Sequence, residues 1–165
     1  MLNLWPSLIK IFKLDQFKYR SLTAGEIQLC REVYAGLINY DQVKVMNHPF
    51  LPWQPKHVFM APIGYIHIRN IHYSEDYSLE GLGYQAIFIH EMAHVYQHQQ
   101  NINVLLRGAV LQSAFFLSMH TYNPYKYTLT QGKKFQQYNI EQQGDIAKDI
   151  FLGRIPNIIL NPDAL

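Results

Sequence analysis

The sequence predicts an α+β domain that is mainly helical with a small sheet, and three observations lead to this class. Four long segments carry apolar residues at helical spacing, whereas two short segments have the β-branched, alternating composition of strands. The chain has 165 residues, of which 48% are hydrophobic. That is long enough to bury one sizeable core and too short for two, so the elements are expected to share a single domain.

The helical spacing places helices at about residues 24–38, 84–100, 103–119 and 134–152. Thr23 and Glu26 have the spacing of a capping box, in which two side chains satisfy backbone N–H groups at the start of a helix. The third helix is almost wholly apolar, yet it contains Arg107 and Gln112 and falls short of the roughly 20 apolar residues of a membrane span. It is therefore expected to be buried in the core.

The two expected strands are short. Val43 and Val45 alternate with polar neighbours, and residues 65–68 (YIHI) are flanked by a proline and a glycine, which favours an edge position. An edge strand beside an active-site helix could hold an extended substrate by main-chain pairing. Residues 125–132 are expected to form a small hairpin or an irregular loop.

The composition argues against several classes of partner. Fourteen Lys and Arg residues against twelve Asp and Glu residues give a net charge of only +2, so no nucleic acid and no membrane partner is expected. Cys30 is the only cysteine, which excludes an internal disulfide and a thiolate zinc cluster. Residues 1–14 are hydrophobic but lack a basic n-region and a cleavage site, so we expect synthesis in the cytoplasm without a signal peptide.

Residues 90–94 (HEMAH) carry the strongest chemical signal. His90 and His94 lie one turn apart, about 6 Å along a helix, so both imidazoles can bind one zinc ion. Glu91 is rotated by about 100° from His90, which lets its carboxylate reach a metal-bound water without binding the metal. The pattern predicts zinc, one ion per chain, with Glu91 as general base. Without a third ligand, two ordinary histidines on a helix face would be the simpler interpretation.

A catalytic zinc needs three protein ligands and one open position. Where metzincins place a third histidine this chain has Gln100, and His98 lies two turns, about 12 Å, along the helix from His90. Glu141 is the stronger candidate, because a second helix can cross the first and present a carboxylate. Asp145, one turn further on, could accept a hydrogen bond from a ligating histidine and fix its tautomer.

These residues point to hydrolysis of a peptide or amide bond. Zinc lowers the pKa of its bound water toward 7, Glu91 accepts the proton, and the hydroxide attacks a carbonyl that the metal polarises. The resulting oxyanion needs a further donor. Among the twelve tyrosines, Tyr122, Tyr127 and Tyr138 precede Glu141 in sequence and are candidate donors, although each is also an ordinary packing residue.

Four segments together resemble a known family: residues 22–26 (LTAGE), 40–43 (YDQV), 90–97 (HEMAHVYQ) and 138–145 (YNIEQQGD). They are similar to the zincin-like proteins described as Vgr-related or Rhs-element-associated, which are linked to bacterial type VI secretion. A looser resemblance is to the peptidase domain of extracellular contractile injection systems. The similarity runs over nearly the whole chain, from about residue 22 to residue 152.

The resemblance implies a zincin-like fold of the gluzincin type with the HExxH helix at its centre. By this resemblance, His90, His94 and Glu141 are the expected zinc ligands, Glu91 is the expected general base, and Asp145 is expected to support a ligand. It also implies an effector exported by a secretion machine, with a protein or peptidoglycan-peptide substrate and with a spike component or an immunity protein as partner. Residues 1–20 look like an N-terminal extension, which leaves residues 21–165 as the domain.

Two other interpretations belong to different functional classes. In the first, the chain is a catalytically inactive binding or adaptor module that holds a secretion spike component. Replacing Glu91 by Gln separates this module from an enzyme, because partner binding survives the change and hydrolysis does not. In the second, which the sequence disfavours, residues 1–14 and 104–119 act on a membrane.

Overall fold

The structure is a computed structural model that describes Lys10 and residues 16–164. Most of the expected extension, including the hydrophobic stretch at residues 1–14 apart from Lys10, therefore lies outside the described residues. The elements are β1 (Tyr19–Ser21), α2 (Ala24–Tyr34), β2 (Lys44–Met46), β3 (Ile66–His67), α3 (Leu82–Gln99), α4 (Val104–Leu117) and α5 (Ile140–Phe151), with short 3-10 turns η2 (Tyr40–Gln42), η3 (Asn70–His72), η4 (Tyr77–Leu79) and η5 (Phe135–Gln137).

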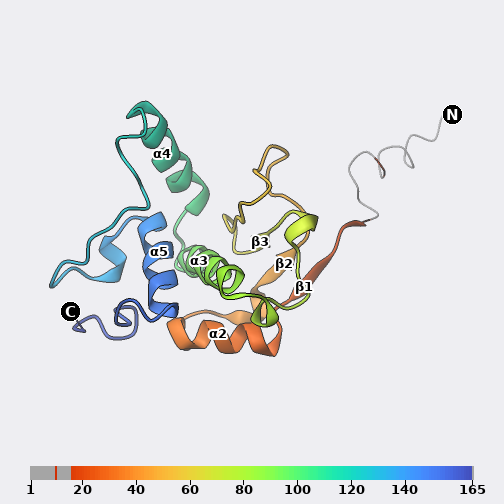
Figure 1. Cartoon of the computed structure of the whole chain (residues 1–165), viewed down its shortest axis with the longest axis horizontal. Coiled ribbons are helices and arrows are strands. Elements are labelled where there is room, and N and C mark those ends of the chain that lie inside the picture. The colour runs from red at the N-terminus through yellow and green to blue at the C-terminus, as the bar shows by residue number, and fades with distance from the viewer. Residues whose placement is uncertain (1–9, 11–15, 165) are drawn as a thin grey trace.

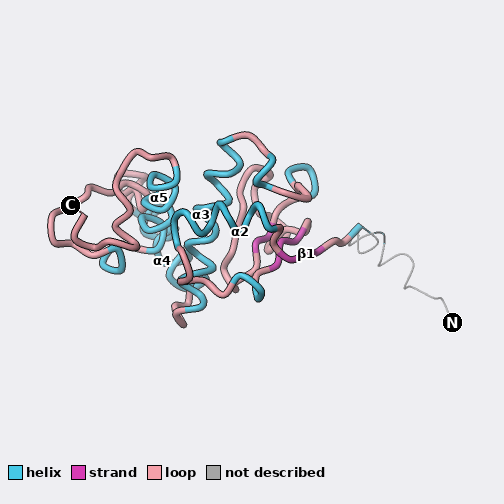
Figure 2. Tube along the Cα trace, turned by 90° about the horizontal axis from the view of Figure 1, so that it is seen from below, coloured by secondary structure: helices cyan, strands magenta, loops and turns pink. Residues whose placement is uncertain are grey.

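The described residues form four α-helices and one three-stranded sheet, which confirms the predicted α+β class. Helix α3 is central, with α5 packed along it, α2 below both, and the sheet on the side away from α5 (Figure 1). Seen from below, the strands gather at one end of the described part, opposite to α5 (Figure 2). The zincin-like character of this arrangement remains a prediction.

The sheet has the order β1-β2-β3 and is mixed: β1 pairs antiparallel with β2, and β2 pairs parallel with β3. β1 was not expected, and it spans the boundary drawn at residue 20. β3 is an edge strand, as its sequence predicts. On its outer side, however, Met60 pairs with His67 through two backbone hydrogen bonds of 2.8 and 3.1 Å. The expectation that a substrate pairs with this strand is therefore wrong at His67.

The predicted capping box at the start of α2 is present and has a second role. The Thr23 hydroxyl accepts from the Glu26 amide at 3.1 Å, and the Glu26 carboxylate accepts from the Thr23 amide at 2.9 Å. Glu26 is fully buried and also accepts from the Arg20 guanidinium at 2.7 Å and from the Tyr77 amide at 2.9 Å. One carboxylate thus joins β1, α2 and the turn η4.

Several helix boundaries differ from the prediction for local reasons. α2 ends at Tyr34, because Ala35 takes a positive φ of 48°. The last predicted helix is divided: η5 comes first, and Asn139 then caps α5, which starts at Ile140. Residues 125–132 form an irregular loop.

The expectation that the apolar third helix is buried is wrong. In α4 only Val104 is buried, whereas Leu106 and Leu117 are 61% and 85% exposed. The hydrophobic core is built by the sheet and by α2, α3 and α5, and no residue of α4 belongs to it. α4 instead extends away from the other helices (Figure 1).

The buried carboxylate yields a stability prediction. Glu26→Ala leaves the Arg20 guanidinium and the Tyr77 amide without their buried acceptor, so the free energy of unfolding should fall by about 3 kcal/mol or more. Glu32→Ala, at an exposed position of the same helix, is the control. Urea denaturation measures both variants, and a loss below about 1 kcal/mol for Glu26→Ala would contradict the central role given to this residue.

Candidate metal centre

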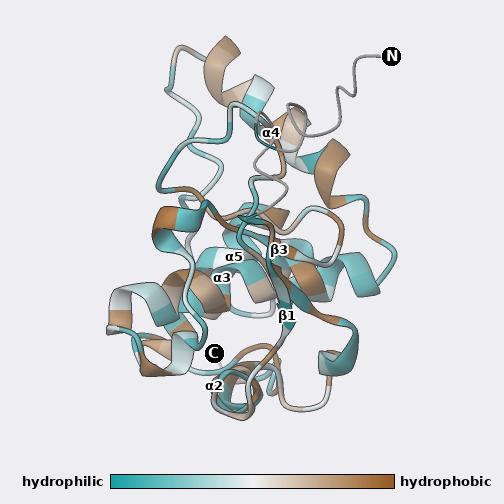
Figure 3. Cartoon of the chain, turned by 90° about the vertical axis from the view of Figure 1, so that its right-hand side faces the viewer, coloured by the Kyte–Doolittle hydropathy of each residue, from teal (hydrophilic) through white to brown (hydrophobic). Residues whose placement is uncertain are grey.

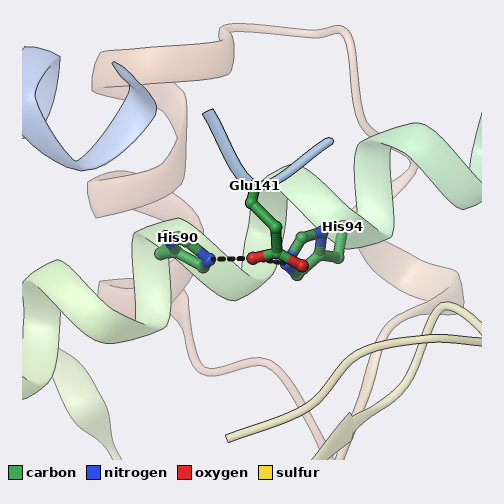
Figure 4. Close-up of side chains that lie close together, drawn as sticks. All are labelled: His90, His94 and Glu141. Carbon is green, nitrogen blue, oxygen red and sulfur yellow. Dashed lines mark ion pairs between the residues drawn. The ribbon is translucent and has the colours of Figure 1, made fainter. Parts of the chain in front are cut away.

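Two histidines of α3 and one glutamate of α5 converge on a common point. One ligand atom from each of His90, His94 and Glu141 lies within 4.8 Å of the others. Glu141 Oε2 is 3.6 Å from His90 Nε2 and 3.7 Å from His94 Nε2, so it sits between the two imidazoles (Figure 4). Two imidazoles and a carboxylate are a donor set that suits zinc. This is the trio that the sequence predicts as metal ligands.

The local structure of α5 brings Glu141 to this position. Asn139 caps the helix through its side-chain oxygen, which accepts from the Gln142 amide at 2.8 Å, and Glu141 follows in the first turn. One turn later Gly144 passes under the His90 ring, where a Cβ added to the glycine would lie 2.5 to 2.7 Å from three ring atoms. Glycine is therefore required for α5 to approach α3 this closely.

The ring nitrogen of His90 that does not face Glu141, Nδ1, lies beside a carboxylate. His90 Nδ1 lies 3.2 Å from Asp145 Oδ1, and Lys148 forms a short ion pair with the same oxygen. A ligating histidine commonly donates its second N–H to such a partner, which fixes the ring and leaves Nε2 free for a metal. The structure thus places Asp145 beside His90 and not beside His94.

The outer nitrogen of His94 is held by an amide that sequence reasoning missed. His94 Nδ1 lies 2.9 Å from Gln97 Oε1. Gln97 is fully buried and donates to the Ile140 carbonyl at 3.0 Å and to Gln143 Oε1 at 2.9 Å. This relay ties the second histidine to the start of α5, next to Glu141. The sequence did contain a signal for this contact: Gln97 comes three residues after His94 in the segment HEMAHVYQ, so the two side chains lie on the same side of the helix.

Glu91 lies next to the trio without being part of it. Its side chain is 6% exposed, and Oε2 has no hydrogen-bond partner among the described residues. Burial raises the pKa of its carboxyl, while His94 and His90 lower it. Because buried acceptors are rarely left unpaired, this oxygen is suited to a proton that arrives with water or substrate.

The charges of the site favour a cation. Burial alone would lower the pKa of His90, but hydrogen bonding to Asp145 and Glu141 raises it to about 10. Burial would raise the pKa of Glu141, yet the two histidines hold it well below its usual range. The carboxylates of Glu91, Glu141 and Asp145 lie around the imidazoles of His90 and His94. A divalent ion would take the place of the protons on these imidazoles.

Of the three tyrosines named from sequence, two have hydroxyls that already donate to other groups. The Tyr127 hydroxyl donates to Asp149, and the Tyr138 hydroxyl donates to the Thr128 carbonyl at 3.3 Å. Tyr122 is about as exposed as Tyr125, but it is the Tyr125 ring that lies beside His90. His98, the alternative ligand, packs against Gly64 and is outside the trio.

Tyr125 is the tyrosine that the structure brings to the site. Its ring centroid lies 6.5 Å from that of His90. Burial, and the negative charges of Glu141 and its neighbouring carboxylates, raise its pKa to about 12, so its hydroxyl keeps its proton at neutral pH. It lies in a loop, and no feature of the sequence separated it from the other tyrosines.

The loop on both sides of Tyr125 is fixed to the start of α5. Asn139 Nδ2 donates to the Pro124 carbonyl at 3.0 Å, and Gln142 Nε2 donates to the Lys126 carbonyl at 2.9 Å. Both donors are the members of the capping box of α5. The residue that carries the phenol is therefore held from either side by the helix that carries Glu141.

Fold and site together define an α+β domain with a candidate mononuclear metal centre between two packed helices. No family model matches the chain. It is 46% identical over 134 residues to the type VI secretion system spike protein VgrG2b of Pseudomonas aeruginosa, an alignment that covers 81% of this chain and 13% of that protein. The chain thus corresponds to a small part of its much longer relative.

A solved structure gives the more specific comparison. The effector domain of Pseudomonas aeruginosa VgrG2b superimposes with a TM-score of 0.75 at 45% identity, covering 81% of this chain and 74% of that one. The chain belongs to the family of the VgrG2b effector domain. The Vgr-related part of the resemblance seen in the sequence is thereby confirmed, whereas its zincin and peptidase parts remain predictions.

The close approach at Gly144 makes a prediction about metal affinity. Gly144→Ala should displace the His90 ring and weaken zinc binding about tenfold to hundredfold. Alanine is the better helix former by about 1 kcal/mol, so the loss would not come from a weaker α5. Gly81→Ala, where a Cβ meets nothing within 4 Å, is the control. Equal zinc affinity of both variants by competition titration would show that the helix spacing does not set the site.

Proposed function

We propose that the chain is a zinc-dependent metallopeptidase of the gluzincin type. The observation that carries this proposal is the convergence of His90, His94 and Glu141 within 4.8 Å, beside a buried Glu91 whose Oε2 has no partner among the described residues. The trio would hold one zinc ion. Two supported histidines, one carboxylate and a free carboxylate nearby are the parts that hydrolysis of an amide requires.

The chemistry divides between the metal and the chain. When bound, zinc supplies Lewis acidity and makes water a nucleophile near neutral pH. Glu91 takes the proton of the attacking water and passes it to the leaving amine, a role for which its raised pKa suits it. Asp145 and Gln97 hold Nδ1 of His90 and His94, so that Nε2 of each imidazole would remain for the ion.

Tyr125 is the residue we assign to the developing oxyanion. It stays protonated because its pKa is raised to about 12, and it lies on the His90 side of the site. The hydrogen bonds at Pro124 and Lys126 fix its backbone before substrate arrives. Stabilisation by a preorganised donor of this kind can contribute a large share of the rate.

The family adds a biological setting to the proposal. Because the relative is an effector domain of a type VI secretion spike protein, we propose that this chain is also a secretion-associated effector. It would be exported by a secretion machine and act on a protein or on a peptidoglycan stem peptide. A spike component and an immunity protein are the further partners that this setting implies.

Metal content tests the ligand assignment. The chain purified without added zinc should hold about one zinc ion, and Glu141→Ala should lose most of it, because two histidines alone bind weakly. His98→Ala is the control, since His98 lies on the same helix but packs against Gly64. Mass spectrometry of the metal gives the result, and a chain that cannot be loaded with zinc would refute the proposed centre.

Glu91→Gln, measured alongside, tests the enzymatic part of the same proposal. This variant should keep its zinc and lose hydrolysis, because an amide cannot accept the proton. A zinc-loaded chain without hydrolytic activity, whose partner binding is unchanged by Glu91→Gln, would instead support the binding or adaptor module.

The role of Tyr125 is tested by removing only its hydroxyl. Tyr125→Phe should lower kcat by about a hundredfold with little change in KM, because the donor acts on charge that develops in the transition state. Tyr122→Phe is a matched control on the same loop, with 39% exposure against 42% for Tyr125. Steady-state kinetics on a peptide substrate gives both values, and equal effects in the two variants would remove Tyr125 from the mechanism.

A further inference from the structure

Helix α4 uses one face to pack on the domain. Val104 is its only buried residue, and Gly108 passes close to Ile140, whose side chain would lie 3.9 Å from a Cβ at that position. At about 100° per residue, Val104, Gly108, Leu111 and Phe115 fall on this inner face. The opposite face is free of contacts with the hydrophobic core.

That opposite face is apolar and strongly exposed. Its large residues are 45% to 85% exposed: Leu105, Leu106, Val110, Phe116 and Leu117. Together with Ala109 they occupy an arc of about 140° on the helix, which we call the apolar arc. Much of the α4 ribbon is accordingly coloured as hydrophobic (Figure 3). Single exposed apolar residues are ordinary, but a contiguous set usually marks an interaction surface.

The side chains of the apolar arc offer no free hydrogen-bond donor. Ser113 is its only polar residue, and its hydroxyl donates to the Ala109 carbonyl of the same helix at 2.8 Å. Away from the two ends of the helix, the backbone amides are paired within it. Protein interfaces normally include about one hydrogen bond per 100–200 Å², and the side chains of the apolar arc would donate none of them.

The part of the chain that contains α4 is also purely basic. Residues 92–140 have no Asp or Glu, and their four charged side chains are Arg107, Lys126, Lys133 and Lys134. The remaining residues carry ten basic and twelve acidic side chains. On α4 itself the one charged side chain is the exposed Arg107, which lies beside the apolar arc and is complementary to an anionic surface.

We propose that α4 binds the surface of an anionic phospholipid bilayer, with the apolar arc among the lipid headgroups and Arg107 near the phosphates. Among the residues that the structure describes, no helix is long and apolar enough to cross a membrane. The proposed contact is adsorption of the exposed helix α4 to the bilayer surface. The sequence-based expectation of no membrane partner rested on the overall charge and on a third helix that contains Arg107 and Gln112 and is too short to span a bilayer. Binding at the surface of a bilayer requires an exposed apolar face and not a span, and α4 has such a face.

A second copy of the chain fits this surface less well. In a symmetric pair the same patch meets itself, so Arg107 would come near its own copy, and α4 has no acidic side chain to pair with it. A bilayer containing phosphatidylglycerol supplies both an apolar layer and negative charge, and it accepts a convex helix without needing a groove.

Sedimentation with lipid vesicles tests the proposal. The chain should bind vesicles of equal parts phosphatidylglycerol and phosphatidylcholine, bind pure phosphatidylcholine much more weakly, and lose affinity as salt rises. Leu106→Gln with Leu117→Gln should weaken binding at least about tenfold, because two leucines no longer enter the apolar layer.

A matched control is available elsewhere in the chain. Leu82 and Leu79 are 60% and 84% exposed, against 61% and 85% for Leu106 and Leu117, so Leu79→Gln with Leu82→Gln removes the same apolar surface. This control should bind vesicles like the unmodified chain. The test uses neither metal nor substrate, so its result is independent of the proposed peptidase activity.

Three results would overturn the proposal. The first is equal binding to both kinds of vesicle, and the second is an equal loss in the two double variants. The third is self-association of the unmodified chain without lipid, abolished by Leu106→Gln with Leu117→Gln in light scattering. That result would assign the apolar arc to a second copy.

Discussion

The spacing between α3 and α5 is the constraint on which the site depends. Glu141 and Asp145 lie one turn apart on α5 and reach opposite sides of the same imidazole, Nε2 and Nδ1 of His90. Both contacts require the helix axis to pass close to the ring, and Gly144 makes this approach sterically feasible. The metal ligands therefore follow from how two helices pack, and the sheet and α2 serve to hold that packing in place.

The two histidines are supported in different ways. His90 faces the carboxylate of Asp145, whose charge is partly balanced by Lys148, whereas His94 faces the neutral amide of Gln97. A carboxylate partner raises the basicity of a ligand more than an amide does. A neutral partner at His94 also limits the negative charge around Glu91, which must give up as well as take a proton.

The sequence was most informative where a physical rule links residues at fixed spacing. The His90 helix, the Thr23 capping box and the class of the fold follow from periodicity and capping alone. Exposure of α4 did not follow, because an apolar composition shows that burial is favourable and not whether the core has room. Tyr125 was missed because its role depends on contacts with segments distant in the sequence, which no local pattern specifies. Gln97 lies three residues after His94 on the same helix, but its hydrogen bonds to α5 could not be predicted from that spacing.

The capping box of α5 has a consequence that concerns which amino acids can occupy it. Asn139 and Gln142 each use the side-chain oxygen for the cap and the side-chain nitrogen for a carbonyl of the Tyr125 loop. Aspartate and glutamate could replace the oxygens but would supply no N–H for the loop. Asn139→Asp or Gln142→Glu, which would be neutral at most helix starts, would here break the hydrogen bonds that hold the Tyr125 loop. These two positions therefore tolerate fewer amino acids than their exposure suggests.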